Sequence, residues 1–208
     1  MEKASHDGKE ARPGRGRPWL FAVLLVIGCA AGTGMTAEGP GPVVERALQQ
    51  SVAILGDARL GEKDKVERLR EVVLPLFDFA EMSRRSLGSH WRRRTPDQRQ
   101  EFTALFTRLL EQTYSKRLAS YNGQRTRLVG EEIDDRFAGV DTEIVDPEGR
   151  RFKVHYRMHH AGEPAKWRIY DVVIENISLV NNYRAQFNRV INRKSFENLV
   201  ERLRSRAG

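Results

Sequence analysis

Apolar residues recur every three or four positions along the first part of the chain, beginning at Val43. This spacing places them on one side of a helix, and Gly56, Gly61, Pro75 and Gly88 interrupt it. The pattern therefore predicts three amphipathic helices, which cover residues 43–55, 62–74 and 77–87.

The clearest helix start in the sequence is Thr95-Pro96-Asp97-Gln98. Thr95 is suited to cap the helix, Pro96 fits its first turn, and Gln98 completes a capping box. An apolar stripe follows, which consists of Phe102, Leu105, Phe106, Leu109, Leu110, Tyr114, Leu118 and Tyr121. Because Asn122-Gly123 supplies a left-handed stop, the pattern predicts one long helix with a buried face.

The hydrophobic period changes to two after Gly123. Between Phe152 and Met158, apolar side chains alternate with basic or imidazole side chains, which is typical of a strand with one buried face. Turn sequences at 146–149 and 161–164 flank this segment, so we expect neighbouring strands to be antiparallel. The predicted strands cover residues 125–133, 137–145, 152–159 and 167–176, and predicted helices over 181–192 and 195–205 end the chain.

These elements predict an α+β domain in which four to five antiparallel strands form a curved sheet packed against N- and C-terminal helices. The many aromatic and aliphatic residues of the domain have two interpretations. They fill an ordinary core, or the curved sheet and the helices enclose an elongated apolar cavity. The pattern by itself leaves both open.

The N-terminal segment has the order of a secretory signal. Basic residues precede the apolar run Trp19–Ile27, which is too short to span a bilayer, and small residues follow it. Cleavage before Glu38 would release a soluble protein; alternatively, the residues ending at Cys29 resemble a lipoprotein box in which this cysteine is lipidated. We expect a periplasmic protein with a signal peptide over 1–37, a flexible linker over 38–42 and a single domain over 43–208.

Composition narrows the functional classes. Cys29 is the only cysteine, which excludes a disulfide framework and a Cys-rich metal site. The sequence contains no nucleophile elbow, zinc-protease motif or phosphate-binding glycine loop. His155, His159 and His160 are better explained as surface side chains than as metal ligands. We therefore expect neither catalytic residues, nor a metal, nor a cofactor.

The chain is basic, with a formal net charge of +8 from 36 Lys and Arg against 28 Asp and Glu. A cluster of arginines surrounds Trp91 and consists of Arg84, Arg85, Arg92, Arg93 and Arg94. Such a cluster is a solvated positive patch, a contact for phospholipid head groups, or a dock for an acidic partner. Export argues against nucleic acid as the partner.

Two stretches of the chain contain distinctive combinations of aromatic, acidic and glycine residues. The first consists of Phe77-Asp78-Phe79-Ala80-Glu81-Met82, Leu87-Gly88, Trp91 and Thr95-Pro96, and the second runs from Trp167 to Phe187. Together with Tyr114, Tyr121 and Gly123, these motifs resemble the MlaC family over about residues 43–203. Asn176 departs from the glycine that is usual in the family, but asparagine also adopts the left-handed backbone.

MlaC proteins are the periplasmic phospholipid-binding components of the Mla ABC transport system, also called toluene-tolerance auxiliary proteins. The resemblance implies a domain that holds the acyl chains of a phospholipid in an apolar cavity between helices and sheet, with the head group at the mouth. It also implies a carrier that shuttles between an inner-membrane Mla ABC transporter complex and an outer-membrane Mla lipoprotein–porin complex, and so maintains outer-membrane lipid asymmetry. Neither a nucleotide nor a metal is implied for the carrier.

The candidate lipid-binding residues lie on the apolar faces that would form the cavity walls. They are Val73, Leu76, Phe77, Phe106, Leu110, Val154, Tyr156, Ile174 and Val180. Ordinary core packing is an equal alternative for each of them. Two other functional classes stay open: a membrane-tethered lipoprotein that docks proteins, and a cone-shaped enzyme of the nuclear-transport-factor type, which would need polar groups inside its cavity.

Overall fold

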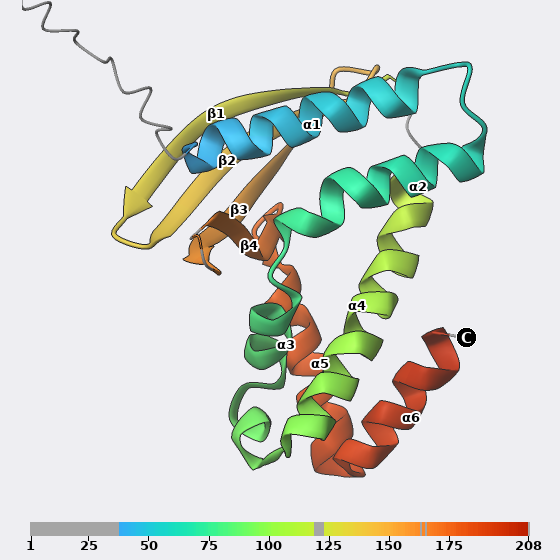
Figure 1. Ribbon diagram of the computed structural model, residues 1–208, viewed down its shortest axis with the longest axis vertical. Helices are drawn as coiled ribbons and strands as arrows, with labels where there is room; N and C mark the ends of the chain where they lie inside the picture. Colours follow the sequence, from blue (N-terminus) through green and yellow to red (C-terminus); the bar gives the residue numbers. More distant parts are fainter. Residues whose placement is uncertain (1–37, 119–122, 163, 165, 208) are drawn as a thin grey trace, which may run out of the picture. The chain divides into compact units, whose positions relative to one another are not determined.

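Helices, then strands, then helices follow one another along the chain (Figure 1). The computed structural model describes residues 38–118, 123–162, 164 and 166–207. Its helices are α1 (Pro40–Gly56), α2 (Glu62–Val73), α3 (Phe79–Leu87), α4 (Pro96–Leu118), α5 (Leu179–Arg193) and α6 (Phe196–Ala207), with short 3-10 helices η1 (Leu74–Leu76) and η2 (Gly88–Arg93). Its strands are β1 (Arg125–Asp134), β2 (Phe137–Val145), β3 (Arg151–Ala161), β4 (Lys166–Ile174) and β5 (Ile177–Ser178). The predicted α+β class is confirmed.

Local signals in the sequence account for several helix ends. The backbone N–H groups of Thr95 and Gln98 each donate to the other residue's side chain at 3.2 Å, which is the predicted capping box of α4. Asp78 caps α3 by accepting a hydrogen bond from the Glu81 N–H group at 2.8 Å. Residues 119–122, where the sequence predicts the end of α4, lie outside the described residues.

The first helix, α1, begins earlier than the sequence predicts. It starts at Pro40, so residues 40–42 belong to a helix and not to a flexible linker. Pro40 suits the first helical turn because an N–H group there would have no intrahelical partner. The N–H group of Gly41 donates to the carboxylate of Glu131 on β1 at 2.7 Å. This bond joins residues 90 positions apart, so no local pattern in the sequence reveals it.

The described strands form one antiparallel sheet in the order β1-β2-β3-β4-β5. Val140 on β2 lies opposite Tyr156 on β3, and Ala138 lies opposite Met158. Because side chains alternate between the two faces of a strand, these residues share one face and Arg157 lies on the other. Val140 and Met158 are fully buried, which confirms the predicted apolar face of the third strand.

α1 covers the apolar face of the sheet at β1 and β2 (Figure 1). Its contacts with the sheet form a buried group that we call the sheet cluster. The sheet cluster consists of Val44, Ala138, Val140, Met158, Trp167 and Ile169. Burial of these side chains between α1 and the strands supplies the main apolar contact that holds the N-terminal helix on the sheet.

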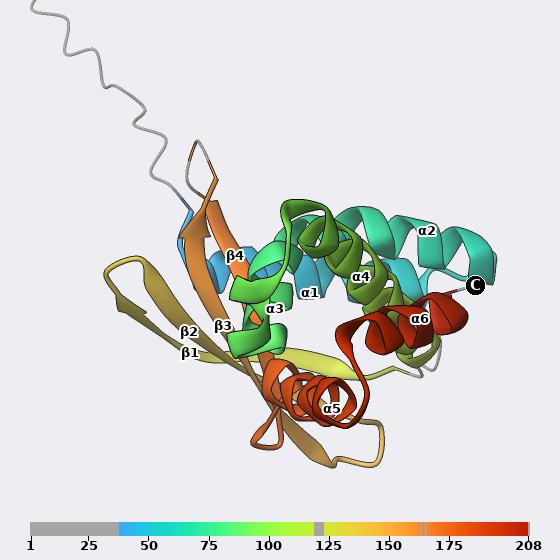
Figure 2. The same cartoon turned by 90° about the horizontal axis from the view of Figure 1, so that it is seen from below.

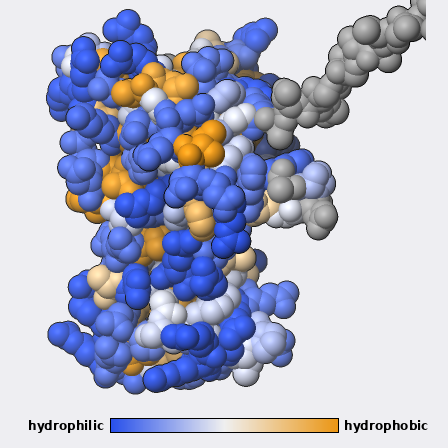
Figure 3. Space-filling view, turned by 90° about the vertical axis from the view of Figure 1, so that its left-hand side faces the viewer, coloured by the Kyte–Doolittle hydropathy of each residue, from blue (hydrophilic) through white to orange (hydrophobic). Residues whose placement is uncertain are grey.

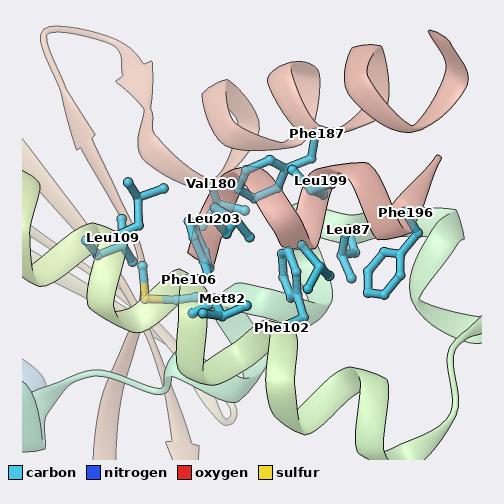
Figure 4. Close-up of a cluster of buried hydrophobic side chains, with 13 residues drawn as sticks. Met82, Leu87, Phe102, Phe106, Leu109, Val180, Phe187, Phe196, Leu199 and Leu203 are labelled. Atoms are coloured by element: carbon cyan, nitrogen blue, oxygen red, sulfur yellow. The ribbon is translucent and has the colours of Figure 1, made fainter. Parts of the chain in front are cut away.

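The helices α3, α4, α5 and α6 pack against one another around a second buried group (Figure 2). This helical cluster consists of Met82, Leu87, Phe102, Leu105, Phe106, Leu109, Leu110, Val180, Phe187, Phe196, Leu199, Val200 and Leu203 (Figure 4). The ring of Phe102 stacks on Phe106 with centroids 5.8 Å apart and meets the Phe187 ring edge-on at 5.5 Å. The buried face of α4 therefore packs mainly against other helices.

All described residues belong to one compact unit. Within the described part of the chain, no helix combines the length and apolar character needed to cross a membrane. The predicted signal peptide over 1–37, including Cys29, lies outside the described residues.

Candidate functional site

The sheet cluster and the helical cluster meet at Phe77, which packs against both. Phe77 follows η1 and pairs with Ile169 on β4, where the Asp78 N–H group donates to the Ile169 carbonyl at 2.9 Å. Asp78 Oδ2 also lies 3.0 Å from Nε2 of His159 on β3. These contacts hold the start of α3 against the sheet. An apolar site between helices and sheet, as the family resemblance implies, would lie at this junction.

Three of the predicted lipid-binding residues share the sheet cluster, and one of them, Phe77, also reaches the helical cluster. Leu76, Phe77 and Tyr156 all pack against the sheet cluster. Each of them is only half-buried, so part of its apolar surface has no protein neighbour. Partly free apolar surface beside a packed core is what an apolar ligand requires.

Three other predicted residues, Phe106, Leu110 and Val180, belong to the helical cluster. Phe106 has no exposed surface, and its ring lies 5.0 Å from the Tyr183 ring and 5.3 Å from the Phe187 ring. Other protein atoms cover the whole surface of this side chain. Phe106 is therefore part of the helical core behind the junction, and its direct contact with a lipid stays a prediction.

The remaining predicted residues belong to neither cluster. Val73 is half-buried at the end of α2, and Val154 is buried on β3. Ile174 lies at the end of β4 and is 36% exposed. The structure does not gather these three residues with the junction, and their role as lipid contacts also stays a prediction.

Tyr156 brings one polar group to the side chains that pack on the sheet cluster. Burial raises the pKa of its hydroxyl to about 12, because the phenolate form would lose its hydration there. A hydrogen bond with Thr142 lowers this pKa but does not offset the effect of burial. Tyr156 is therefore uncharged at physiological pH, as an apolar ligand would require.

The large apolar side chains that stay exposed within the described residues all belong to the sheet. They are Val129, Ile133, Phe152, Ile174 and Ile177. Figure 3 shows apolar surface as separate patches on a largely hydrophilic face. Phe152 is 37% exposed, although the alternation places it on the apolar face of β3, because it lies next to the first residue of that strand and outside the sheet cluster.

Away from Leu76, Phe77 and Tyr156, a cleft of about 500 Å³ lies between α3, η2, β4 and α5. We call it the arginine cleft; Arg84, Arg85, Arg92, Arg157 and Arg184 line it. The sequence singles out the first three of these arginines. Arg157 on β3 and Arg184 on α5 are distant in the sequence, so only folding brings them to the same cleft. Arg94 of the predicted cluster instead lies over the Phe196 ring, 4.6 Å from its centroid.

Two carboxylates balance part of this positive charge. Glu81 pairs with Arg84 at 2.5 Å and with Arg85 at 2.7 Å. The hydrogen bond from Arg84 is the main cause that lowers the pKa of Glu81 from 4.5 to about 2. Asp171 is buried and lies 3.2 Å from Arg157. Both acids therefore act as fixed partners of arginines.

The described residues include no group of three or more His, Cys, Asp or Glu side chains that could hold a metal ion. His155 lies 2.9 Å from the Asp141 carboxylate, and His159 bonds to Asp78 as described above. The ring of His160 lies 3.9 Å from the Trp167 ring. Contacts with neighbouring side chains thus account for all three imidazoles.

The comparisons with known proteins agree with this architecture. The family model described as MlaC protein matches residues 45–205. The chain is 21% identical over 142 residues to the intermembrane phospholipid transport system binding protein MlaC of Haemophilus influenzae, a match that spans 67% of this chain and 66%, just under two thirds, of that protein. It is 25% identical over 162 residues to the toluene tolerance protein ttg2D of Pseudomonas putida, which spans 74% of this chain and 73% of that protein.

A solved structure has the same fold. It is the phospholipid-binding protein from Ralstonia solanacearum in complex with a phospholipid, and it superimposes with a TM-score of 0.72 at 27% sequence identity. The superposition covers 82% of this chain and 97% of the Ralstonia chain. Because the family model spans most of the chain and the fold agrees with it, this chain belongs to the MlaC protein family.

Proposed function

We propose that this protein binds a phospholipid by its acyl chains at the junction between the sheet cluster and the helical cluster. The observation that carries the proposal is the junction itself, where half-buried Phe77 packs against both cores and half-buried Leu76 and Tyr156 pack against the sheet cluster. The phospholipid complex of the Ralstonia relative, which shares the fold, supports the same class of ligand.

Such a binding site solves a physical problem of lipid transfer. Two acyl chains of about 15 methylenes each, at roughly 0.8 kcal/mol per methylene, oppose free passage through water by about 24 kcal/mol. A carrier must replace most of the contacts that the chains lose on leaving a bilayer. A junction of apolar side chains between two buried clusters is suited to this task.

We further propose that the protein acts in the periplasm as a carrier between membrane complexes. The signal-like N-terminal segment supports export, and the name of the Haemophilus relative supports intermembrane phospholipid transport. In this proposal, the carrier exchanges lipid with an inner-membrane Mla ABC transporter complex and an outer-membrane lipoprotein–porin complex, and thereby maintains outer-membrane lipid asymmetry. Lipidation of Cys29 would instead tether the carrier to one membrane.

Native mass spectrometry of the protein purified from bacterial periplasm tests the binding proposal. We expect a mass excess that matches one or two diacyl phospholipids, and organic extraction should release the same lipids. A lipid-free mass in repeated gentle preparations would contradict the proposal, and the half-buried residues at the junction would then be ordinary core.

A matched pair of variants locates the site. Leu76→Glu places a charge at the junction, whereas Ile133→Glu makes the same change in an isomeric side chain that is 53% exposed on β1. We expect Leu76→Glu to lose most of the co-purifying lipid, because a carboxylate in an apolar site costs several kcal/mol, and Ile133→Glu to keep it. Circular dichroism confirms that each variant is folded. Equal lipid content in both folded variants would place the lipid elsewhere.

A further inference from the structure

The arginine cleft is a positively charged concave site that has no role in the proposed binding of acyl chains at the junction. Arg84 and Arg85 enter it from α3, Arg92 from η2, Arg157 from β3 and Arg184 from α5. The acidic residue that lines the cleft is Asp171. Five guanidinium groups around one small volume repel one another unless anions lie between them.

Three of these arginines already have carboxylate partners. Arg84 and Arg85 share Glu81, and Arg157 pairs with Asp171. Arg92 and Arg184 have no carboxylate within 4.0 Å among the residues that the structure describes, and both are exposed to the cleft. The cleft therefore carries two guanidinium groups whose charge no described side chain balances.

The fold positions one of these two groups closely. Gly88 has a φ of +57°, which favours glycine, and a Cβ atom placed on it would lie 2.8 Å from Nε of Arg184. The Arg184 guanidinium therefore lies directly against the backbone at the end of α3, where any larger residue would displace it. Glycine at position 88 therefore leaves room for the Arg184 guanidinium at the cleft wall.

Two segments that contribute to the cleft carry several basic residues and no acidic residue. Residues 82–96 contain five arginines and no Asp or Glu, and residues 176–196 contain Arg184, Arg189, Arg193 and Lys194 without any Asp or Glu. These two segments lie side by side because α3 packs on α5. Trp91 and Tyr170 complete the lining, and the Arg85 guanidinium lies 4.1 Å from the Tyr170 ring centroid.

We propose that the arginine cleft binds the phosphate group of a phosphate ester, with Arg92 and Arg184 as the two cations that contact it. A phosphate offers several acceptor oxygens and takes paired N–H donors from guanidinium groups. The cleft volume of about 500 Å³ suits a phosphorylated head group more than the flat surface of an acidic protein. The source of the phosphate is a lipid head group or a soluble phosphate ester.

Calorimetric titration with glycerol 3-phosphate tests the site on the whole exported protein. The variant Arg92→Gln/Arg184→Gln removes both unpaired cations. Its matched control, Arg93→Gln/Arg189→Gln, removes the same charge from exposed arginines of the same two segments that do not line the cleft. We expect the cleft variant to bind at least about tenfold more weakly than the wild type and the control to stay within about twofold, since charged hydrogen bonds are lost only in the first.

The outcomes separate the alternatives. Equally weakened binding of glycerol 3-phosphate in both variants would indicate a diffuse charge effect and overturn the proposed site. A wild type that does not bind glycerol 3-phosphate would also overturn it. Stronger competition by a poly-glutamate peptide than by glycerol 3-phosphate would assign the cleft to an acidic protein and overturn the phosphate assignment.

Flotation with phosphatidylcholine vesicles, with and without phosphatidylglycerol, identifies the source. Binding to the vesicles that depends on Arg92 and Arg184 makes the source a bilayer head group. If the protein binds glycerol 3-phosphate in the titration but does not bind the vesicles, the source of the phosphate is a single phosphate ester, either in solution or on a carried lipid. Lipid co-purification in the cleft variant is measured in parallel. If the carrier proposal is wrong, the wild type purifies without lipid but still binds glycerol 3-phosphate in the titration. The failure of one proposal can therefore be distinguished from the failure of the other.

Discussion

Glu81 links two arginines of the same helix. Its carboxylate accepts hydrogen bonds from Nε of Arg84 at 2.6 Å and from Nε of Arg85 at 2.7 Å. These bonds stabilise the ionised form and lower its pKa to about 2. The residue sits in the first turn of α3, where a negative charge also interacts favourably with the helix dipole. Both of these arginines also line the arginine cleft.

This lowered pKa predicts how stability depends on pH. A carboxylate whose pKa falls on folding stabilises the protein above its unfolded pKa, and the contribution disappears as the pH falls from about 4.5 to about 2. We expect Glu81→Gln to lower the unfolding free energy by about 1 kcal/mol at pH 7, after allowance for solvent screening of the ion pairs.

Urea denaturation at pH 7 and at pH 3 measures this difference. The gap between wild type and Glu81→Gln should narrow at the lower pH. The control is Glu132→Gln, which removes an exposed carboxylate on β1 that has no ion pair among the described residues, and it should change little at either pH. A gap for Glu81→Gln that is independent of pH would show that the carboxylate charge is not responsible.

The turn between β4 and β5 depends on backbone conformation at single residues. Glu175 and Asn176 have φ values of 47° and 65°, in the left-handed region. Asparagine tolerates this region better than most residues, because its short side chain bonds locally. The expectation that Asn176 can adopt the left-handed backbone is confirmed by its φ.

At the level of elements, α4 is the centre of the helical part. Phe102 and Phe106 lie one helical turn apart and contact residues from α5 and α6. The apolar stripe in the sequence predicts that one face of this helix is buried, and this is confirmed for Phe102 through Leu110. The stripe does not reveal its partners, because an apolar face is equally suited to a sheet or to other helices.

Truncating the centre of this helix should have a large effect. Phe102 is fully buried among three other aromatic rings, so Phe102→Ala leaves a cavity and should cost about 3 to 5 kcal/mol of unfolding free energy. Phe152→Ala makes the same change at a side chain that is 37% exposed on β3, and it should cost about 1 kcal/mol or less. Thermal or urea unfolding compares the two variants, and similar losses would be inconsistent with the described packing.

At the scale of the whole molecule, Asp171 joins the sheet to the helical part. It lies on β4, is 2% exposed, and accepts hydrogen bonds from the Ser178 hydroxyl at 2.6 Å and the Val180 N–H group at 3.0 Å. Arg157 completes its partners at 3.2 Å. Since α5 begins at Leu179, these bonds fix where the C-terminal helices leave the sheet.

The variant Asp171→Asn should therefore weaken the connection between the two parts. The amide removes the negative charge and places an N–H₂ group against existing donors, which should cost about 2 to 3 kcal/mol. The control is Asp141→Asn, since Asp141 is exposed on β2 and pairs with His155, and it should cost less than about 1 kcal/mol. Chemical denaturation provides the comparison, and equal losses would argue against a special role for Asp171.

The sequence by itself determined the type, order and approximate limits of the elements, because helix and strand periods, caps and turn residues act over a few neighbouring positions. The sequence also contained the motifs that resemble the family, and it singled out three of the arginines that line the arginine cleft. Only the tertiary structure decided that the apolar residues divide into two clusters, that Phe77 joins them, and that Phe106 lies inside a core. The same holds for Arg157 and Arg184, which reach the cleft from distant elements. The physical reason is that burial and charge pairing depend on contacts between residues far apart in the chain, which no local pattern specifies.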